Sequence, residues 1–227
     1  MPIKPQSGNM YEFVTHTWNP VRGKCAYNCS YCYVKKWGEP GLIHLDEREL
    51  RADLDEGNYI FVCSGCDLFH KDMSKQWIDR VMDWTAYFPD NQYLWHTKNP
   101  NRALDFQGRF HDRDMLCVTI ESNRDYPDIS AAPPPYQRFA NLYLWEKPYM
   151  LTIEPVLDFD IFYFTKLIVH TGKNLPVQIN IGADSGNNHL PEPSREDVLD
   201  LITELEKFTT VYKKPNLDRI LKGKNHG

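Results

Sequence analysis

Three cysteines lie close together near the start of the chain, in the stretch HTWNPVRGKCAYNCSYCYVKKWG. Cys25, Cys29 and Cys32 have the spacing C-x3-C-x2-C. Structural zinc takes four ligands, usually from paired C-x2-C units, so three thiols leave one position to be filled by another residue. An iron–sulfur cube can instead be held by three thiolates, which leaves one iron open to chelation by a small molecule. A cluster, a zinc site and buried free thiols all stay open at this point.

The composition indicates the cellular compartment in which these thiols act. The chain has 227 residues, an ordinary hydrophobic content of 41% and a net charge of −5. It has no apolar run near the roughly 18 residues of a membrane span, and its first residues lack the apolar core of a signal peptide. We therefore expect a cytoplasmic protein with no membrane partner. Clustered thiols in a reducing compartment are more often metal ligands or catalysts than disulfides.

Charge is distributed unevenly along the chain. The segment 207–227 carries six basic residues against the single acid Asp218, a local charge of +5, so the remainder carries −10. A basic tail can contact phosphate, and it can equally be a solvated chain end.

Short apolar runs alternate with helical patterns along the whole chain. Most of the runs are nearly continuous, as in strands that are covered on both faces of a parallel sheet. Strands that alternate with helices predict right-handed βαβ units. We therefore expect one domain over residues 1–227, with a core at about 11–214 and the basic tail at 207–227. Its predicted fold is α/β, a partial (β/α)6 TIM-type barrel with a mostly parallel sheet and outer helices. The expected strands are 11–17, 59–64, 92–97, 115–121, 149–154, 177–182 and 209–214, and the expected helices are 30–37, 46–55, 74–88, 99–105, 136–142 and 193–208.

The cysteine stretch resembles the signature of the radical S-adenosylmethionine (SAM) superfamily, C-x3-C-x-aromatic-C after the first strand. CAYNCSYC fits it, with Tyr31 as the aromatic residue. The resemblance implies that Cys25, Cys29 and Cys32 hold a [4Fe–4S] cluster, that SAM chelates the open iron, and that Tyr31 packs near the adenine. It also implies reductive cleavage of SAM to a 5′-deoxyadenosyl radical, which abstracts hydrogen from a substrate.

A narrower resemblance covers nearly the whole chain. HTWNPVRGKC, DLF, HTKNP, VTIE, TIEPVL, IGADSG and VYKKPNL occur here in the order seen in the phage and bacterial three-Cys-motif family of radical-SAM-like proteins. The chain departs from that family with HTK in place of LTK, and with Asp184 in place of a glutamate. The resemblance implies a phage-related enzyme with a nucleic acid or nucleotide as substrate, and an electron donor of the flavodoxin or ferredoxin type.

The turn FVCSGCDLF offers a second candidate site. In the superfamily this position carries a small-residue turn that ends in an acid and holds the amino group of SAM, which implies that role for Ser64, Gly65 and Asp67. Cys63 and Cys66 form a C-x2-C pair that can serve zinc or redox chemistry. We expect them to be small, half-buried residues, and Cys117 to lie in the core.

Other polar residues follow the later strands, where barrel enzymes place their chemistry. Glu121 and Asn123 can bind ribose hydroxyls or simply form a strand exit. Lys98 can pair with the carboxylate of SAM or with a substrate phosphate, and the Asn-Pro that follows it can equally cap a helix. Gly182 opens the turn 181–184, which can approach an adenine or be an ordinary turn.

Glu154 follows a buried strand, and a buried charge needs a partner. It either faces the active site or pairs with Arg138 or Arg124.

Two alternative functions stay open besides that of a radical SAM enzyme. One is a zinc-stabilised binding module in which Cys25, Cys29 and Cys32 are joined by Cys63, Cys66 or His16. The other is a degenerate family member that keeps a cluster for structure or sensing.

Overall fold

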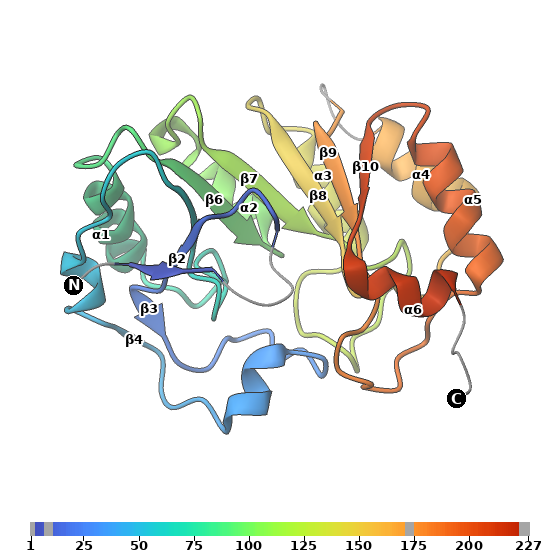
Figure 1. Ribbon diagram of the computed structural model, residues 1–227, viewed down its shortest axis with the longest axis horizontal. Coiled ribbons are helices and arrows are strands. Elements are labelled where there is room, and N and C mark those ends of the chain that lie inside the picture. The colour runs from blue at the N-terminus through green and yellow to red at the C-terminus, as the bar shows by residue number, and fades with distance from the viewer. Residues whose placement is uncertain (1–2, 7–10, 171–174, 223–227) are drawn as a thin grey trace. The chain divides into compact units, whose positions relative to one another are not determined.

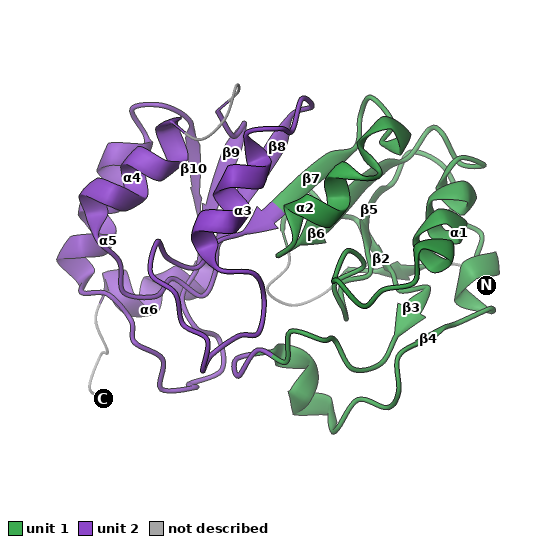
Figure 2. Ribbon diagram, turned by 180° about the vertical axis from the view of Figure 1, so that it is seen from behind, with its two compact units in different colours: residues 1–28, 32–117 green, residues 29–31, 118–227 purple. Residues whose placement is uncertain are grey.

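The computed structural model describes residues 3–6, 11–170 and 175–222. It consists of two compact units, residues 1–28 with 32–117 and residues 29–31 with 118–227 (Figure 2). The residues 29–31, which contain the second motif cysteine, belong to the second unit although their neighbours in sequence belong to the first.

The first unit contains a mostly parallel sheet with the strand order β1-β2-β5-β6 (Figure 1). β2 pairs with β5 and β5 with β6 in parallel, whereas β1 is antiparallel to β2. β3 and β4 form a separate antiparallel ribbon. These elements are β1 (Lys4–Pro5), β2 (His16–Trp18), β3 (Val21–Arg22), β4 (His44–Leu45), β5 (Tyr59–Val62), β6 (Gln92–Thr97), α1 (Lys75–Thr85), α2 (Pro100–Leu104) and the 3-10 helices η1 (Tyr33–Trp37), η2 (Glu49–Arg51) and η3 (Gln107–Arg109).

The second unit repeats this parallel pattern with the strand order β8-β9-β10. All five residues of β8 are buried, as a strand covered on both faces requires. β7 (Met115–Thr119) runs from the first unit into the second. The other elements are α3 (Pro135–Leu142), β8 (Tyr149–Ile153), α4 (Ile161–His170), β9 (Gln178–Ile181), α5 (Arg195–Leu205), β10 (Thr210–Lys213), η4 (Pro215–Leu217) and α6 (Asp218–Leu221).

The predicted strands all exist, but one of them is shorter than predicted, two helical predictions are wrong and one helix was not predicted. The first strand is shorter than predicted, because 11–15 contain a turn and pairing begins at His16. The helices predicted at 30–37 and 46–55 are only short 3-10 turns. α4 was not predicted, because its sequence IFYFTKLIVH is rich in aromatic and β-branched residues that favour strands.

Asp160 starts α4 by accepting a hydrogen bond from the backbone N–H of Tyr163 at 3.0 Å. Among the described residues, no helix is long and apolar enough to cross a membrane.

Candidate functional site

The loop that carries the cysteine motif is closed at its ends by the first unit. The backbone N–H of Lys24 donates to the carbonyl of Gly41 at 2.9 Å, directly beside the β3–β4 ribbon. Gly23 has a φ of +107°, and a Cβ there would meet the carbonyl oxygen of Leu42 at 2.5 Å, so only glycine fits. Cys25 and Cys32 belong to this unit and are partly exposed, and no motif cysteine is in a disulfide.

The middle of the loop is held by the second unit. The backbone N–H of Ser30 donates to the carbonyl of Ile129 at 2.8 Å. The buried thiol of Cys29 lies 3.1 Å from the hydroxyl of Ser130, and the hydroxyl of Tyr31 donates to Glu121. Backbone, thiol and phenol therefore all fix this part of the loop.

Glu121 is the buried centre of this attachment. Its second carboxylate oxygen accepts a hydrogen bond from Arg138 at 2.7 Å, and both side chains are almost fully buried. Arg138 also donates to the carbonyl of Thr119 at 2.8 Å. Burial and the negative charge of Glu121 raise the pKa of Tyr31 well above its usual value, so the phenol keeps its proton. Both carboxylate oxygens have protein donors, so Glu121 holds the cysteine loop, and its contact with a ribose stays a prediction.

The turn 64–67 after β5 is organised by Asn19, a residue of the TWNP motif. The side-chain oxygen of Asn19 accepts from the backbone N–H of Gly65 at 3.0 Å and from the Ser64 hydroxyl at 3.2 Å. The hydroxyl of Tyr33 donates to the carbonyl of Ser64 at 2.5 Å. Asn19 and Tyr33 thus fix a turn whose contact with SAM stays a prediction.

The two cysteines of this turn are buried, rather than half-buried as predicted. Cys63 has a φ of +55°. A hydrogen bond with Cys63, burial and the nearby Cys25 raise the pKa of Cys66 well above its usual value, so Cys66 is a neutral thiol.

Asp67 connects the ends of β5 and β6. Its carboxylate accepts from the Thr97 hydroxyl at 2.8 Å and from the backbone N–H of Lys98 at 2.7 Å. Burial raises the pKa of Asp67, although these hydrogen bonds oppose the shift. Asn99, the N-cap residue of α2, donates to the carbonyl of Phe69 at 3.0 Å. The motifs DLF and HTKNP therefore interlock. Asn99 and Pro100 begin α2 as predicted, but the Asn99 side chain makes no capping hydrogen bond to the helix.

Glu154 lies at the end of β8 and pairs with Lys214 rather than with Arg138 or Arg124, the two partners that the sequence offered. Its contact with a cofactor stays a prediction. The carboxylate and the Lys214 ammonium are 2.6 Å apart, and Lys214 is 4% exposed. Asn216 donates to the other carboxylate oxygen at 2.7 Å. Because Gly182 has no Cβ, the Glu154 carboxylate can lie against it, where a Cβ would be only 2.7 Å from an oxygen. Gly182 is therefore packed against a protein side chain, and its contact with an adenine stays a prediction.

Two further candidates lie at strand exits. The side-chain oxygen of Asn123 accepts a hydrogen bond from the backbone N–H of Asp160 at 2.9 Å. This contact fits the second of the two roles given for Asn123, that of a residue that shapes the strand exit. Lys98 is partly buried after β6. Contacts of Asn123 and Lys98 with a cofactor stay predictions.

Within residues 3–6, 11–170 and 175–222, no three side chains of the His, Cys, Asp and Glu types form a group that could hold a metal ion. The zinc alternative takes its fourth ligand from Cys63, Cys66 or His16. Of these, His16 has its Nδ1 atom 3.0 Å from the hydroxyl of Thr15, and Cys66 has its thiol 3.8 Å from the carbonyl of Val21. Three cysteines that form no disulfide are nevertheless a donor set that suits an iron–sulfur cluster.

The basic tail is largely neutralised in its described part, up to residue 222. Its five cations there each pair with a carboxylate, and Lys224 lies outside the described residues. The pairs are Lys207–Glu204, Lys213–Glu206, Lys214–Glu154, Arg219–Glu192 and Lys222–Asp218. The tail therefore gives less support to phosphate binding than its sequence indicates.

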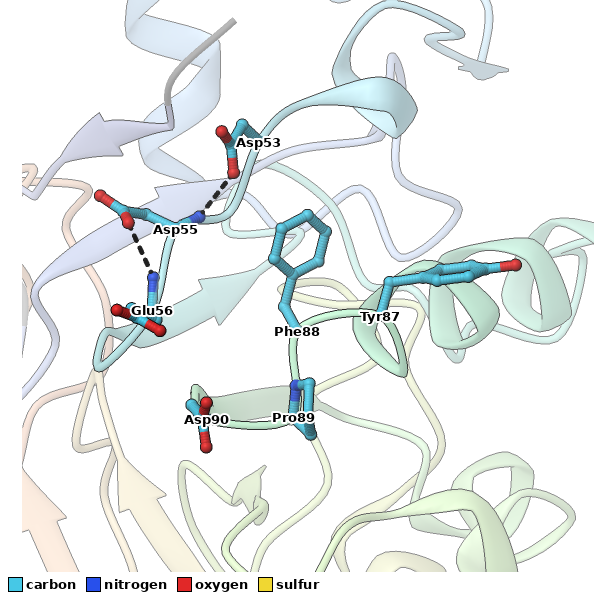
Figure 3. A pocket seen from close by; sticks show the side chains of 7 residues that line it. All are labelled: Asp53, Asp55, Glu56, Tyr87, Phe88, Pro89 and Asp90. Carbon is cyan, nitrogen blue, oxygen red and sulfur yellow. Dashed lines mark hydrogen bonds between the residues drawn. The ribbon is translucent and has the colours of Figure 1, made fainter.

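A pocket in the first unit is lined mostly by acidic and aromatic side chains (Figure 3). Its residues precede β5 and β6, at the opposite ends of these strands from the turn 64–67 and Lys98. It is therefore separate from the candidate site. The lining residues are Asp53, Asp55, Glu56, Tyr87, Phe88, Pro89 and Asp90.

A family model described as "Protein of unknown function (DUF5131)" matches residues 9–132, more than half of the chain. The chain belongs to the DUF5131 family. The matched range includes the cysteine motif, the turn 64–67 and the interlocked motifs DLF and HTKNP. A comparison with curated protein sequences found no significant match.

Solved structures of spore photoproduct lyase share the fold. A mutant of that enzyme with one cysteine replaced by serine is similar with a TM-score of 0.63 and 11% identity, over 92% of this chain and 78% of that one. A mutant with one tyrosine replaced by phenylalanine gives a TM-score of 0.62 and 8% identity, over 93% and 80%. A double mutant with bound AdoMet and dinucleoside spore photoproduct gives 0.55 and 10% identity, over 91% and 66%. The predicted fold, a partial TIM-type barrel with a mostly parallel sheet and outer helices, is confirmed by this similarity.

Sequence reasoning missed the residues that support the site. Asn19, Lys214 and Asn216 lie in the motifs TWNP and VYKKPNL, which were recognised without a role for these side chains. Arg138 was considered only as a partner of Glu154. The signal for Asn19, Lys214 and Asn216 was a polar residue in a motif beside buried strands, whereas Arg138 lies in none of the motifs.

Proposed function

We propose that this protein is a radical SAM enzyme that acts on a nucleic acid or nucleotide. Cys25, Cys29 and Cys32 would hold a [4Fe–4S] cluster with SAM at the open iron. The observation that carries the proposal is a set of three cysteines with the radical SAM spacing and in no disulfide, on a chain that shares its fold with spore photoproduct lyase. We further place the chain with the phage and bacterial three-Cys-motif proteins, on the motif order given above.

The residues of the chain supply positioning. Ser130 and the Tyr31–Glu121–Arg138 group hold the middle of the cysteine loop, and Asn19 and Tyr33 shape the turn 64–67. When bound, the cluster would supply the electron that cleaves SAM to a 5′-deoxyadenosyl radical for hydrogen abstraction. The protein contributes binding, orientation and exclusion of water, while the cofactor carries the chemistry.

The substrate class rests on the similar solved structures. Three of them hold a dinucleoside spore photoproduct, and their TM-scores with this chain are 0.57, 0.55 and 0.54. DNA or RNA modification or repair is therefore the reaction class that we favour. An electron donor of the flavodoxin or ferredoxin type would reduce the cluster.

Anaerobic reconstitution with iron and sulfide tests the proposal. We expect a brown protein with about four irons per chain, the content of one such cube, and 5′-deoxyadenosine after addition of dithionite and SAM. Replacing any one of Cys25, Cys29 and Cys32 with serine should abolish both signals. Cys117→Ala is the matched control, because Cys117 is a buried cysteine outside the motif and in no disulfide.

One zinc per chain in protein purified in air, unchanged by anaerobic iron loading, would instead favour the binding module. A colourless reconstituted protein that makes no 5′-deoxyadenosine would contradict the proposal.

A further inference from the structure

The segment 33–42, with the sequence YVKKWGEPGL, begins directly after the third motif cysteine and presents large apolar side chains to solvent. Trp37 is 77% exposed, Leu42 91% and Tyr33 43%. All six tryptophans lie in the described ranges, and the other five are buried or partly buried. Because an exposed indole leaves a large apolar surface in water, Trp37 marks an interaction surface.

The aromatic pair in this segment is held in place. The rings of Tyr33 and Trp37 lie edge to face, with centroids 5.4 Å apart and an interplanar angle of 88°. Tyr33 is anchored through its hydrogen bond to Ser64, and Gly41 is anchored through its hydrogen bond to Lys24. A platform that is already ordered loses little conformational entropy when a ligand stacks on it.

The charge around Trp37 suits a phosphate backbone. From residue 23 to residue 42 there are three lysines, Lys24, Lys35 and Lys36, against the single acid Glu39, which gives +2 on a chain of net charge −5. All three lysines are exposed, and the Lys35 ammonium donates to the carbonyl of Asn28 at 3.2 Å.

We propose that the segment 33–42 binds single-stranded nucleic acid, with a base stacked on Trp37 and phosphates beside Lys35 and Lys36. Aromatic stacking combined with a basic track is how proteins hold single strands, and a duplex offers no free base face except at its ends. A protein partner fits less well, because lysine is depleted in protein–protein interfaces. This inference rests on the proposed function and names where its substrate binds.

Binding of a fluorescein-labelled twelve-nucleotide oligo-dT to the protein without cluster, followed by anisotropy, tests the inference. Trp37→Ala should weaken binding by about 5- to 150-fold, the effect of losing one stacked base. Trp37→Phe keeps an aromatic face and should recover part of the loss. Tyr87→Ala is the matched control, because Tyr87 is 74% exposed and lies outside the segment.

Salt dependence tests the lysines. A double variant with Lys35→Ala and Lys36→Ala should reduce the slope of log K against log salt by about 1.4, since each phosphate contact with a single strand contributes about 0.7. The matched control pair is Lys75→Ala with Lys207→Ala, on exposed lysines outside the segment.

Several outcomes would overturn the inference. These are equal affinities of the wild type and Trp37→Ala, an equal loss in Tyr87→Ala, preference for a duplex of the same length, and binding to vesicles rich in phosphatidylserine without binding to the oligonucleotide. Failure of this inference is distinguishable from failure of the proposed function. Protein that cleaves SAM without binding the oligonucleotide refutes only the inference, and protein that binds it but never forms 5′-deoxyadenosine refutes only the proposed function.

Discussion

At the scale of single residues, the charged side chains near the site are satisfied by the protein itself. Glu121 has Arg138 and Tyr31, and Glu154 has Lys214 and Asn216. A buried carboxylate with its donors in place fixes backbone positions, and removing one partner leaves a charge that is costly to bury. These carboxylates therefore belong to the framework that positions the cysteine loop and the turn after β9.

Replacing Arg138 with methionine should destabilise the protein by about 3–5 kcal/mol, because the carboxylate of Glu121 is left buried without its cation. Urea unfolding measures the effect. The double variant Arg138→Met with Glu121→Gln should recover much of the loss, since the buried charge is gone. Arg80→Met breaks an exposed ion pair with Glu47 and should change stability little. A single Arg138 variant as stable as the wild type would contradict the framework role.

Gly182→Ala should cost about 1–3 kcal/mol, because the added Cβ overpacks the contact with Glu154. A Cβ at position 182 lies 2.7 Å from a carboxylate oxygen, whereas one at Gly108 meets nothing within 4 Å. Gly108→Ala is thus the matched control, and equal unfolding midpoints for the two variants would show that Glu154 moves aside freely.

At the scale of elements, α5 and α1 both begin after a serine, and they differ in whether that serine caps the helix. Ser194 and Asp197 form a complete capping box at α5. Ser74 occupies the corresponding position of α1, but its side chain makes no capping hydrogen bond. The same residue type therefore stabilises one helix and not the other.

Ser194→Ala should lower stability by about 1 kcal/mol, the usual cost of a lost N-cap. For a chain of this size that is about 2–4 °C in the unfolding midpoint. Ser74→Ala should shift the midpoint much less. Thermal unfolding followed by circular dichroism compares the two, and equal shifts would mean that the capping geometry does not matter here.

The loop after β9 depends on the charge of Asp184. Burial would raise the pKa of Asp184, but backbone N–H donors from Asn188 and Gly186 and the cation of Arg219 hold it below the usual 3.8. A lowered pKa stabilises the fold above the pKa of the unfolded chain, and this contribution is lost as the pH falls through the folded value. Asp184→Asn should therefore destabilise the protein at pH 7, and by less below about pH 3.8. The test is to compare the urea unfolding midpoints of the wild type and Asp184→Asn at pH 7 and below about pH 3.8. A larger loss of stability at the lower pH would contradict the prediction.

At the scale of the whole molecule, each part of the cysteine loop is fixed by contacts within its own compact unit. The backbone of Lys24 is bonded to Gly41, and the thiol of Cys29 lies against the hydroxyl of Ser130. A cluster held by these thiols would bind only the folded chain, because the loop receives its fixed geometry from residues far away in sequence.

SAM should accordingly stabilise the reconstituted protein and not the protein without cluster. A ligand at 100 times its dissociation constant adds about 2.7 kcal/mol when it binds only the folded state. For a chain of this size we expect a rise of about 5–10 °C in the unfolding midpoint. Differential scanning fluorimetry under anaerobic conditions measures it, with Cys29→Ser as the control. An equal shift without cluster would show that SAM binds elsewhere.

The sequence alone determined the order and class of the elements. Buried parallel strands are continuous apolar runs and a capping box is contained in four residues, so both are local signals. β6, predicted at 92–97, is found at Gln92–Thr97. Where local signals conflict, as in the aromatic and β-branched α4, sequence reasoning failed.

Only the tertiary structure decided which side chains meet. Tyr31 and Glu121 are 90 residues apart in sequence, and Glu154 and Lys214 are 60 apart. Hydrogen bonds and ion pairs depend on positions in space to within a fraction of an ångström, and no local pattern encodes them. The sequence therefore identified the candidate thiols, and the tertiary structure decided which residues hold their loop.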